Sequence, residues 1–365
     1  MDADILFSSF NLSGLELKNR MVMAPLTRCR AIPGIDAPQA MNAVYYGQRA
    51  TAGLIISEAT QISPTAKGYA WTPGIYSPEQ VAGWKLITNV VHEQGGKIFA
   101  QLWHVGRISH PSLQPHNQDP VAPSAIKPVD QKTFIEQGGG GFAEVGTPRA
   151  LALEEIPTII ADYRKAAQNA MEAGFDGVEI HAANGYLIQQ FLSDGSNKRT
   201  DNYGGSIPNR LRFCLEVCEA VTQVVGAART GIRLSPVGTI NGTSDTHPAA
   251  VYFPLLRELS HLKLAYVHII EGTTRGPRDL EGLDFHALRR EFTGAWMVNN
   301  NYTRELAIEA LASGYADLVA FGRPFIANPD LVRRFQLNAP LTEWDQSTFY
   351  GGNTKGYTDY PFLDQ

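Results

Sequence analysis

The stretch GVEIHAANGY, residues 177–186, is a short apolar run that ends abruptly in polar side chains. Its start predicts a buried β-strand, because valine and isoleucine suit a pleated buried surface. The residues that follow, His181, Asn184 and Tyr186, provide an imidazole, a carboxamide and a phenol. Two N–H donors and a weak acid can polarise a carbonyl group and protonate the adjacent carbon, which indicates a candidate catalytic site. A core histidine followed by a turn is the alternative interpretation.

Short apolar runs of this kind recur along the whole chain. They begin near residues 21, 53, 97, 177, 231, 266, 295 and 318, and helix-like segments follow them. This alternation predicts parallel strands joined by right-handed crossovers, and eight such units predict a closed (β/α)8 TIM barrel of the α/β class. A doubly wound sheet is the alternative. The residues after the first strand, Ala24-Pro25-Leu26-Thr27, lack the glycine fingerprint of that fold.

The length of the chain fits one large barrel with extensions. A typical barrel has about 250 residues, and we expect a single domain over residues 1–365. The additional residues are expected in an N-terminal hairpin within 4–19, in a loop or hairpin inserted after the third strand at 105–152, and in an aromatic C-terminal tail. The inserted region is rich in proline and glycine and has no sustained helical period.

The composition excludes several classes of protein. The formal net charge is −5, so no basic excess is present to neutralise a nucleic-acid backbone. The first 20 residues lack the apolar core of a signal peptide, and no apolar run approaches membrane-spanning length, so we expect a cytoplasmic protein. The three cysteines are expected to be reduced thiols, because a disulfide framework or a zinc site would need a fuller set of ligands.

Polar residues stand at the carboxyl ends of the predicted strands, where barrels place their chemistry. Thr27 ends the first strand, Gln101 the third, and Arg323 follows the eighth. Arg233 lies inside the fifth strand, and a buried arginine must face an anion or several acceptors. A salt bridge to a barrel carboxylate is the alternative for Arg233. Barrels often bind phosphate after strands seven and eight, and the residues placed for it are Asn300, Asn301, Gly322 and Arg323.

Longer motifs carry a resemblance. In order, the chain contains MAPLTR (23–28), EATQIS (58–63), QLWHVGRIS (101–109), HAANGYLIQQFL (181–192), NKRTDNYGGS (197–206) and AFGRPFIANPDL (320–331), with FYGG and GYTDYP near its end. These motifs span nearly the whole chain, which resembles the old yellow enzyme family of flavin-dependent ene-reductases. The bacterial pentaerythritol tetranitrate and morphinone reductases are members of that family.

The resemblance implies FMN bound without a covalent bond at the barrel mouth. It implies that Thr27 and Gln101 contact the flavin ring, that Arg233 lies beside the ring edge where negative charge collects on reduction, and that Arg323 holds the phosphate. The other implied cofactor contacts are Pro25, Ala59, Gly322, Asn300 and Asn301. Residues 299–301 are asparagines, whereas the family usually has a glycine in this segment. Because asparagine tolerates a left-handed backbone, we still expect a backbone N–H contact with the phosphate.

The resemblance also implies roles toward the substrate. His181 and Asn184 hold the substrate's oxygen and Tyr186 donates the proton. The implied pocket walls are Tyr69, Trp103 and Tyr350.

The function implied is that of an NAD(P)H-dependent FMN oxidoreductase. It reduces activated C=C bonds in enones, maleimides and nitroalkenes by a ping-pong mechanism, with nitrate esters or nitroaromatics as further substrates. NADPH or NADH is the reductant, and the chain is a monomer or a homodimer. Two alternatives are a metal-dependent barrel hydrolase using His104, His181 and His268, and a flavin-binding protein without catalytic activity.

Overall fold

Eight parallel strands close into a barrel in the computed structural model, which describes residues 3–274, 276–278 and 282–363. The barrel strands are β3 (Met21–Met23), β4 (Leu54–Ile56), β6 (Ile98–Trp103), β11 (Gly177–Ala182), β12 (Thr230–Leu234), β13 (Tyr266–Ile270), β14 (Ala295–Asn299) and β15 (Leu318–Phe321). Pairing of β15 with β3 and of β11 with β6 closes the ring. The predicted (β/α)8 barrel and its eight strand positions are therefore confirmed.

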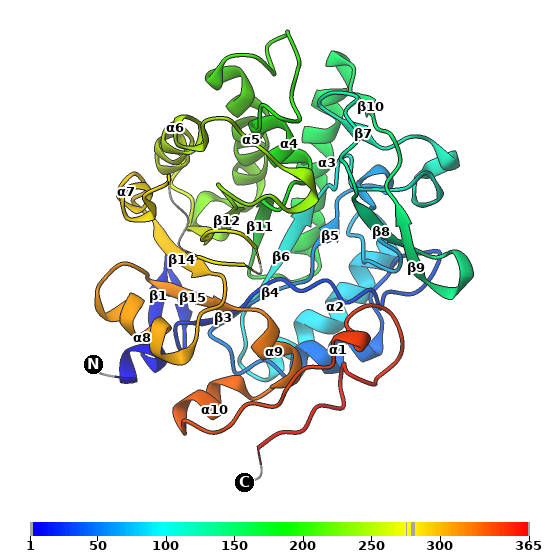
Figure 1. Ribbon diagram of the computed structural model, residues 1–365. Coiled ribbons are helices and arrows are strands. Elements are labelled where there is room, and N and C mark those ends of the chain that lie inside the picture. Colours follow the sequence, from blue (N-terminus) through cyan, green and yellow to red (C-terminus); the bar gives the residue numbers. More distant parts are fainter. Residues whose placement is uncertain (1–2, 275, 279–281, 364–365) are drawn as a thin grey trace.

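Helices surround the barrel and cover its outer face (Figure 1). The longer ones are α1 (Ala40–Gly47), α2 (Pro78–Glu93), α3 (Ile156–Glu172), α5 (Ile207–Val225), α6 (Pro248–His261) and α8 (Arg304–Ala312). Helix α2 begins as its sequence predicts, because the Ser77 hydroxyl accepts from the Gln80 N–H at 3.3 Å and Pro78 occupies the first turn. Short 3-10 helices lie at Ala3–Phe7, Pro64–Ala66, Pro111–Leu113, Pro115–Asn117, Gln137–Gly139, Leu153–Glu155, Ala227–Arg229, Ile240–Gly242 and Gln346–Thr348.

Three short helices were not expected from the sequence: α4 (Leu187–Leu192), α7 (Phe285–Arg290) and α9 (Arg323–Ala327). Each is too short to show a helical period. Pro324 marks a break in the sequence pattern, yet proline is well tolerated in the first turn of a helix, where α9 places it. The last helix, α10 (Leu331–Gln336), begins two residues later than expected at 329.

The N-terminal hairpin closes one end of the barrel. Strands β1 (Phe10–Leu12) and β2 (Leu15–Leu17) pair antiparallel, as predicted. Leu12 and Leu17 pack in one apolar cluster with Phe99 of β6, and this cluster fills the end of the barrel where the strands begin. None of the described helices has the length and apolar character needed to cross a membrane.

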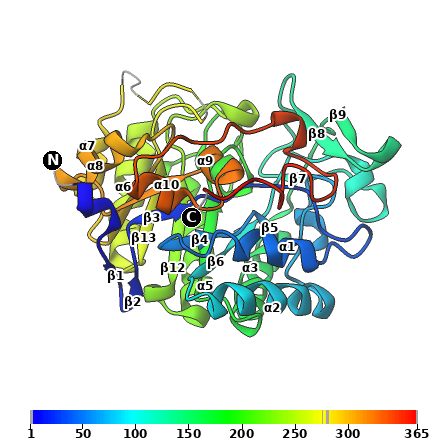
Figure 2. The same ribbon diagram turned by 90° about the horizontal axis from the view of Figure 1, so that it is seen from below.

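The inserted region at 105–152 lies at the other end of the barrel (Figure 2). Its strands β8 (Lys132–Ile135) and β9 (Gly141–Glu144) form an antiparallel hairpin, and β7 (Val121–Ala122) pairs with β10 (Arg149–Ala150). A further short strand, β5 (Thr60–Gln61), extends the sheet beside β6. The inserted region thus stands over the strand ends at which barrel chemistry occurs.

Candidate functional site

A cavity of about 520 Å³ opens at the carboxyl ends of the barrel strands. All site residues proposed from the sequence line it: Pro25, Thr27, Ala59, Tyr69, Gln101, Trp103, His181, Asn184, Tyr186, Arg233, Asn300, Asn301, Gly322, Arg323 and Tyr350. They come from loops and strands far apart in the chain, and the closed barrel brings them to one place.

His181 presents a hydrogen-bond donor to this cavity. Its side chain lies near the end of β11, and its Nδ1 accepts from the Ala183 N–H at 3.3 Å. Burial, together with the charge of Arg233, holds the pKa of His181 well below its ordinary value, so the ring is neutral. A neutral imidazole whose Nδ1 accepts carries its proton on Nε2.

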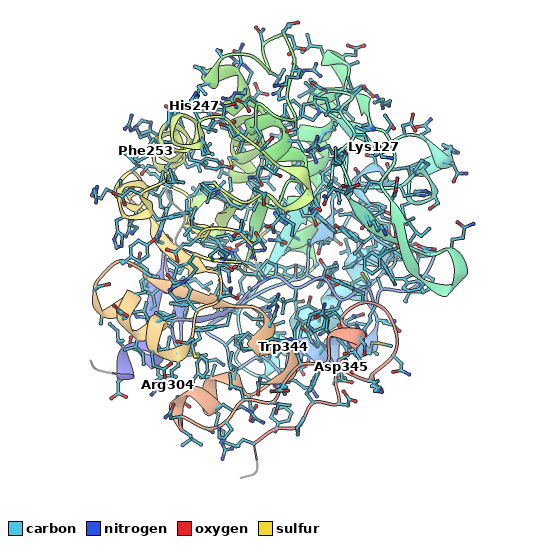
Figure 3. The ribbon with its side chains drawn as sticks, viewed as in Figure 1. Lys127, His247, Phe253, Arg304, Trp344 and Asp345 are labelled. Atoms are coloured by element: carbon cyan, nitrogen blue, oxygen red, sulfur yellow. The ribbon has the colours of Figure 1, made fainter. Side chains whose placement is uncertain are left out.

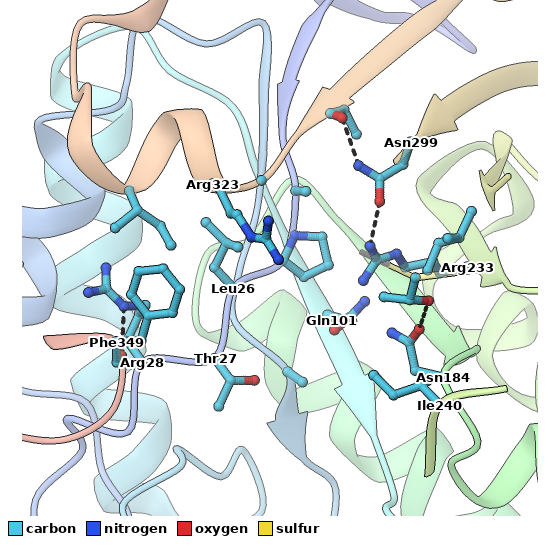
Figure 4. Close-up of a pocket in the computed structure, with 18 of the residues that line it drawn as sticks. Leu26, Thr27, Arg28, Gln101, Asn184, Arg233, Ile240, Asn299, Arg323 and Phe349 are labelled. Atoms are coloured by element: carbon cyan, nitrogen blue, oxygen red, sulfur yellow. Dashed lines mark hydrogen bonds between the residues drawn. The ribbon is translucent and has the colours of Figure 1, made fainter. Parts of the chain in front are cut away.

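Asn184 is held by contacts on both its backbone and its side chain. Its backbone is left-handed, with φ of 58°, and its N–H donates to Ser235 Oγ at 2.8 Å. Its Oδ1 accepts from Thr274 Oγ1 at 2.8 Å, and Figure 4 marks this hydrogen bond at Asn184. With the carboxamide oxygen engaged, the amide nitrogen is the group left to donate to a ligand.

Tyr186 stands at the N-terminus of α4 among other aromatic rings. Its hydroxyl lies 3.1 Å from the hydroxyl of Tyr69, and its ring meets Trp103 edge to face at 5.0 Å between centroids. Tyr69 in turn stacks on Trp103 at 5.6 Å. His181 also meets Tyr186 edge to face at 5.0 Å. The phenol and the imidazole are therefore neighbours on one aromatic wall.

Arg233 projects from β12 toward the cavity without a direct carboxylate partner among the described residues. One amino group, Nη2, donates to Asn299 Oδ1 at 2.8 Å, and Asn299 in turn donates to the Ala320 carbonyl at 2.7 Å (Figure 4). Its Nε is buried without a hydrogen-bond partner. Burial lowers the pKa of Arg233 to about 10, so the side chain remains a cation at neutral pH. The salt bridge considered as an alternative for Arg233 is not formed.

Arg323 begins helix α9 and makes no ion pair with a described carboxylate. Its guanidinium carbon lies 5.7 Å from the ring of Trp344, which stands in the C-terminal tail (Figure 3). A Cβ placed on the neighbouring Gly322 would meet only Leu26, at 3.6 Å. Backbone at Gly322 therefore faces open space beside a cation, an arrangement that suits an anion.

Asn300 and Asn301 both adopt positive φ, 114° and 52°. The Asn300 amide nitrogen donates to the carbonyls of Glu271 at 2.6 Å and Thr273 at 2.9 Å. Asn301 donates to the carbonyl of Gly276 at 3.0 Å. Both side chains thus stabilise the loop that follows β13, and the same loop contains Thr274.

Several cavity residues were missed from the sequence. They include Lys132, Phe134, Phe142, Ile240, Asn241, Thr274, Asn299, Trp344 and Phe349. Asn299 is the last residue of β14, so the strand-end rule applied to every strand would have found it. Phe349 belongs to the FYGG motif, but the hairpin residues and Trp344 lie in no motif, because loop position over a barrel depends on tertiary packing.

The three histidines of the hydrolase alternative do not form a metal site. Nδ1 of His104 accepts from the Gly106 N–H at 3.1 Å, and burial lowers the His104 pKa to about 3. His268 contacts Glu179. No group of three His, Cys, Asp or Glu side chains in the described parts of the chain is arranged to hold a metal ion.

Comparison with known proteins agrees with this geometry. The profile of the family described as "NADH:flavin oxidoreductase / NADH oxidase family" matches residues 5–342. The chain is 47% identical over 369 residues to 12-oxophytodienoate reductase 1 of Oryza sativa subsp. japonica, covering 99% of this chain and 93% of that protein. It is 44% identical to 12-oxophytodienoate reductase 2 of Arabidopsis thaliana, covering 98% of this chain and 96% of that one.

Solved structures are similar over nearly the whole chain as well. Morphinone reductase in complex with tetrahydroNAD superposes with a TM-score of 0.94 at 53% identity, covering 98% of each chain. The old yellow enzyme homologue from Zymomonas mobilis superposes with a TM-score of 0.93 at 46% identity, covering 98% of this chain and 99% of that one.

Proposed function

This chain belongs to the NADH:flavin oxidoreductase / NADH oxidase family, and we propose that it reduces activated C=C bonds with electrons from NADH or NADPH. The observation that carries the proposal is the grouping of His181, Asn184 and Tyr186 on one wall of the cavity. The proposed substrates are small enones, maleimides and nitroalkenes, with nitrate esters or nitroaromatics as further substrates. Relatives named as reductases of 12-oxophytodienoate and of morphinone support this class.

FMN is the cofactor of this family, and the residues of the cavity fit it. Arg323 and the open backbone at Gly322 suit one phosphate group, and Arg233 brings a buried, unpartnered N–H to the same cavity. When bound, FMN accepts a hydride from the nicotinamide and passes it to the substrate. We assign Arg323, Gly322, Asn300 and Asn301 to its phosphate.

The flavin ring is assigned to residues at the centre of the cavity. Thr27 and Gln101 would hydrogen-bond its edge, and Arg233 would stand where negative charge collects on reduction. Pro25 and Ala59 add packing contacts. Tyr69, Trp103 and Tyr350 are assigned to the walls that bind planar substrates above it, since flat apolar rings select flat ligands.

Two donors activate the substrate. The His181 Nε2–H and the Asn184 amide hydrogen-bond its carbonyl or nitro oxygen and draw electron density from the double bond. The β-carbon becomes electrophilic, and a hydride can add there. Tyr186 then transfers its phenolic proton to the α-carbon. A phenol is protonated at neutral pH, so no environmental shift is needed for this step.

The same cavity receives both the nicotinamide and the substrate. His181, Asn184 and Tyr186 offer one set of donors in this cavity, so the two ligands would alternate at the same place. A ping-pong cycle follows. The three cysteines are free and buried, which agrees with a reducing compartment, and we assign the protein to the cytoplasm as a monomer or a homodimer.

Two measurements test the proposal together. Denaturation should release FMN rather than FAD, identified by chromatography, and the holoenzyme should oxidise NADH or NADPH in the presence of 2-cyclohexenone and yield cyclohexanone. A coloured protein without this turnover would support a non-catalytic flavin-binding protein. Release of FAD, or failure to bind FMN, would contradict the proposed cofactor and therefore the proposed function.

A further inference from the structure

Glu179 lies buried at the centre of the barrel, beneath the cavity, with none of its surface exposed. Its Oε1 accepts from Gln101 Nε2 at 2.7 Å. Its Oε2 accepts from the Tyr266 hydroxyl at 3.1 Å and contacts His268 Nδ1 at 2.9 Å. A carboxylate held by three donors from two other strands, β6 and β13, is costly to bury, which indicates a use beyond packing.

The strand register explains how these groups meet. Glu179 on β11 lies opposite Gln101 on β6 and opposite Gly231 on β12. Gly231 in turn lies opposite Tyr266 on β13. A Cβ on Gly231 would overlap the Tyr266 ring, so the glycine gives that ring the space to reach Glu179. The network is therefore fixed by the barrel itself.

Glu179 is an anion at neutral pH. Burial alone would raise its pKa, but the hydrogen bonds from His268 and Gln101 and the charge of Arg233 oppose burial, and the pKa of Glu179 lies below its ordinary value. Burial, together with Arg233, lowers the pKa of His268 despite Glu179. His268 Nε2 has no partner, so the neutral ring carries its proton on Nδ1 and donates it to Glu179. His268 therefore does not cancel the negative charge.

The carboxylate fixes the orientation of Gln101. A carboxylate only accepts, so the Gln101 amide nitrogen must face Glu179, and the amide cannot flip without bringing two oxygens together. The Gln101 carbonyl oxygen is then the group left for a ligand at the cavity wall (Figure 4). A glutamine at position 179 could donate as well as accept, and it would remove this constraint.

The carboxylate also opposes the charge of Arg233. The two groups form no direct ion pair, but Arg233 stands on β12 only two residues beyond Gly231, the residue opposite Glu179, and Glu179 raises the pKa of Arg233 against the effect of burial. One anion and one cation thus lie together beneath the cavity. The reduced form of a flavin carries more negative charge than the oxidised form, so an anion at this place disfavours reduction.

We propose that Glu179 is a positioning residue that turns the Gln101 carbonyl toward the cofactor and lowers the reduction potential of the bound flavin. The inference rests on the proposed function, because it requires FMN in this cavity. Removing one buried charge beneath the cavity should change the reduction equilibrium by on the order of tenfold.

The test is the midpoint potential of Glu179→Gln holoenzyme, measured by reductive titration against a reference dye. We expect a more positive potential, with a tenfold change in equilibrium corresponding to about 30 mV for a two-electron couple. We also expect weaker FMN binding, because the Gln101 amide can now flip. Tyr266→Phe is the matched control, since it removes a neutral donor from the same carboxylate and keeps the charge. Its potential should equal that of the parent.

A Glu179→Gln protein that binds FMN with the parent potential would overturn the inference and leave the proposed function intact. If that variant does not fold, Glu179→Asp is the second test: it keeps the charge and loses reach to Gln101. We expect weaker FMN binding with the parent potential, and a tenfold shift in the Asp variant would contradict the assigned role of charge. A parent chain that binds no FMN would contradict the proposed function instead.

Discussion

The floor and the rim of the cavity are built in different ways. The floor consists of the strand residues Gln101, His181 and Arg233, with Glu179 beneath them, and the register of neighbouring strands places all four buried residues. The rim consists of loop residues such as Asn184, Thr274, Asn300 and Asn301, and the three asparagines have positive φ. Strand register involves many residues, whereas a loop conformation depends on a few side-chain hydrogen bonds.

This difference predicts two kinds of variant. Changes at Gln101, Arg233 and the underlying Glu179 should alter the reduction potential and the retention of the cofactor, because these side chains lie around the assigned ring site. Changes in the rim should alter binding and proton transfer while the barrel stays folded, because loops tolerate substitution better than buried strands.

The largest effect is expected at the boundary of the two regions, in Tyr186→Phe. The variant lacks only the hydroxyl, so enone reduction should slow by about 10² to 10⁴, the range that general acid catalysis supplies. Reduction of a quinone should slow much less, because its oxygens can take protons from solvent. Single-turnover kinetics with each oxidant would measure this, and an enone rate equal to that of the parent would remove Tyr186 from the mechanism.

The next effect concerns one floor residue and one rim residue, His181 and Asn184. Phenols that bind as phenolates over the flavin should give a long-wavelength charge-transfer band. Each alanine substitution should weaken phenol binding roughly ten- to hundredfold, since hydrogen bonds to a charged group are worth about 1.5 to 3 kcal/mol. The double variant should lose the band and keep FMN. If the double variant shows the full band, another group holds the oxygen.

The variants Arg323→Ala and Arg233→Ala compare a residue at the rim with a residue in the floor, through FMN retention and the reduction potential of the flavin. Loss of Arg323 should weaken FMN retention roughly ten- to hundredfold, because it removes a charge-assisted contact with phosphate. Loss of Arg233 should instead make the flavin harder to reduce. Equilibrium dialysis and redox titration measure the two effects. Equal retention in both variants at an unchanged potential would contradict both assignments.

The smallest effect is expected at Thr274, which holds the Asn184 carboxamide at 2.8 Å. Thr274→Val keeps the shape and removes the hydroxyl, so phenol binding should weaken about two- to tenfold, the size of one net hydrogen bond of 0.5 to 1.5 kcal/mol. Thr274→Ser should behave like the parent. FMN binding should not change in either variant. Identical phenol binding in the Val and Ser variants would show that Thr274 does not orient Asn184.

The same contrast explains what the sequence could predict. The barrel strands were recognisable as short apolar runs. His181, Gln101 and Arg323 were recognisable as candidate site residues because they stand at or near the ends of these strands. Longer motifs, matched to a family, supplied proposed roles for single residues such as Thr27, and these roles stay predictions. Rules that hold for every barrel, such as the position of the active site at the strand ends, can therefore be applied to the sequence alone.

Other features could not be predicted from pattern alone. Glu179 lies in the very strand that predicts the fold, yet its partners Gln101, Tyr266 and His268 are 78, 87 and 89 positions away in the chain. Helices α4, α7 and α9 are too short for a period to emerge. Phe142 reaches the cavity only because the hairpin folds over the strand ends.

The most direct test of the proposed function is an anaerobic stopped-flow measurement of the two half-reactions. NADH or NADPH should bleach the flavin absorption of the holoenzyme, and 2-cyclohexenone mixed with the reduced enzyme should restore it and yield one equivalent of cyclohexanone. A flavin that neither coenzyme reduces, or a reduced enzyme that oxygen reoxidises but the enone does not, would contradict the assignment as an ene-reductase.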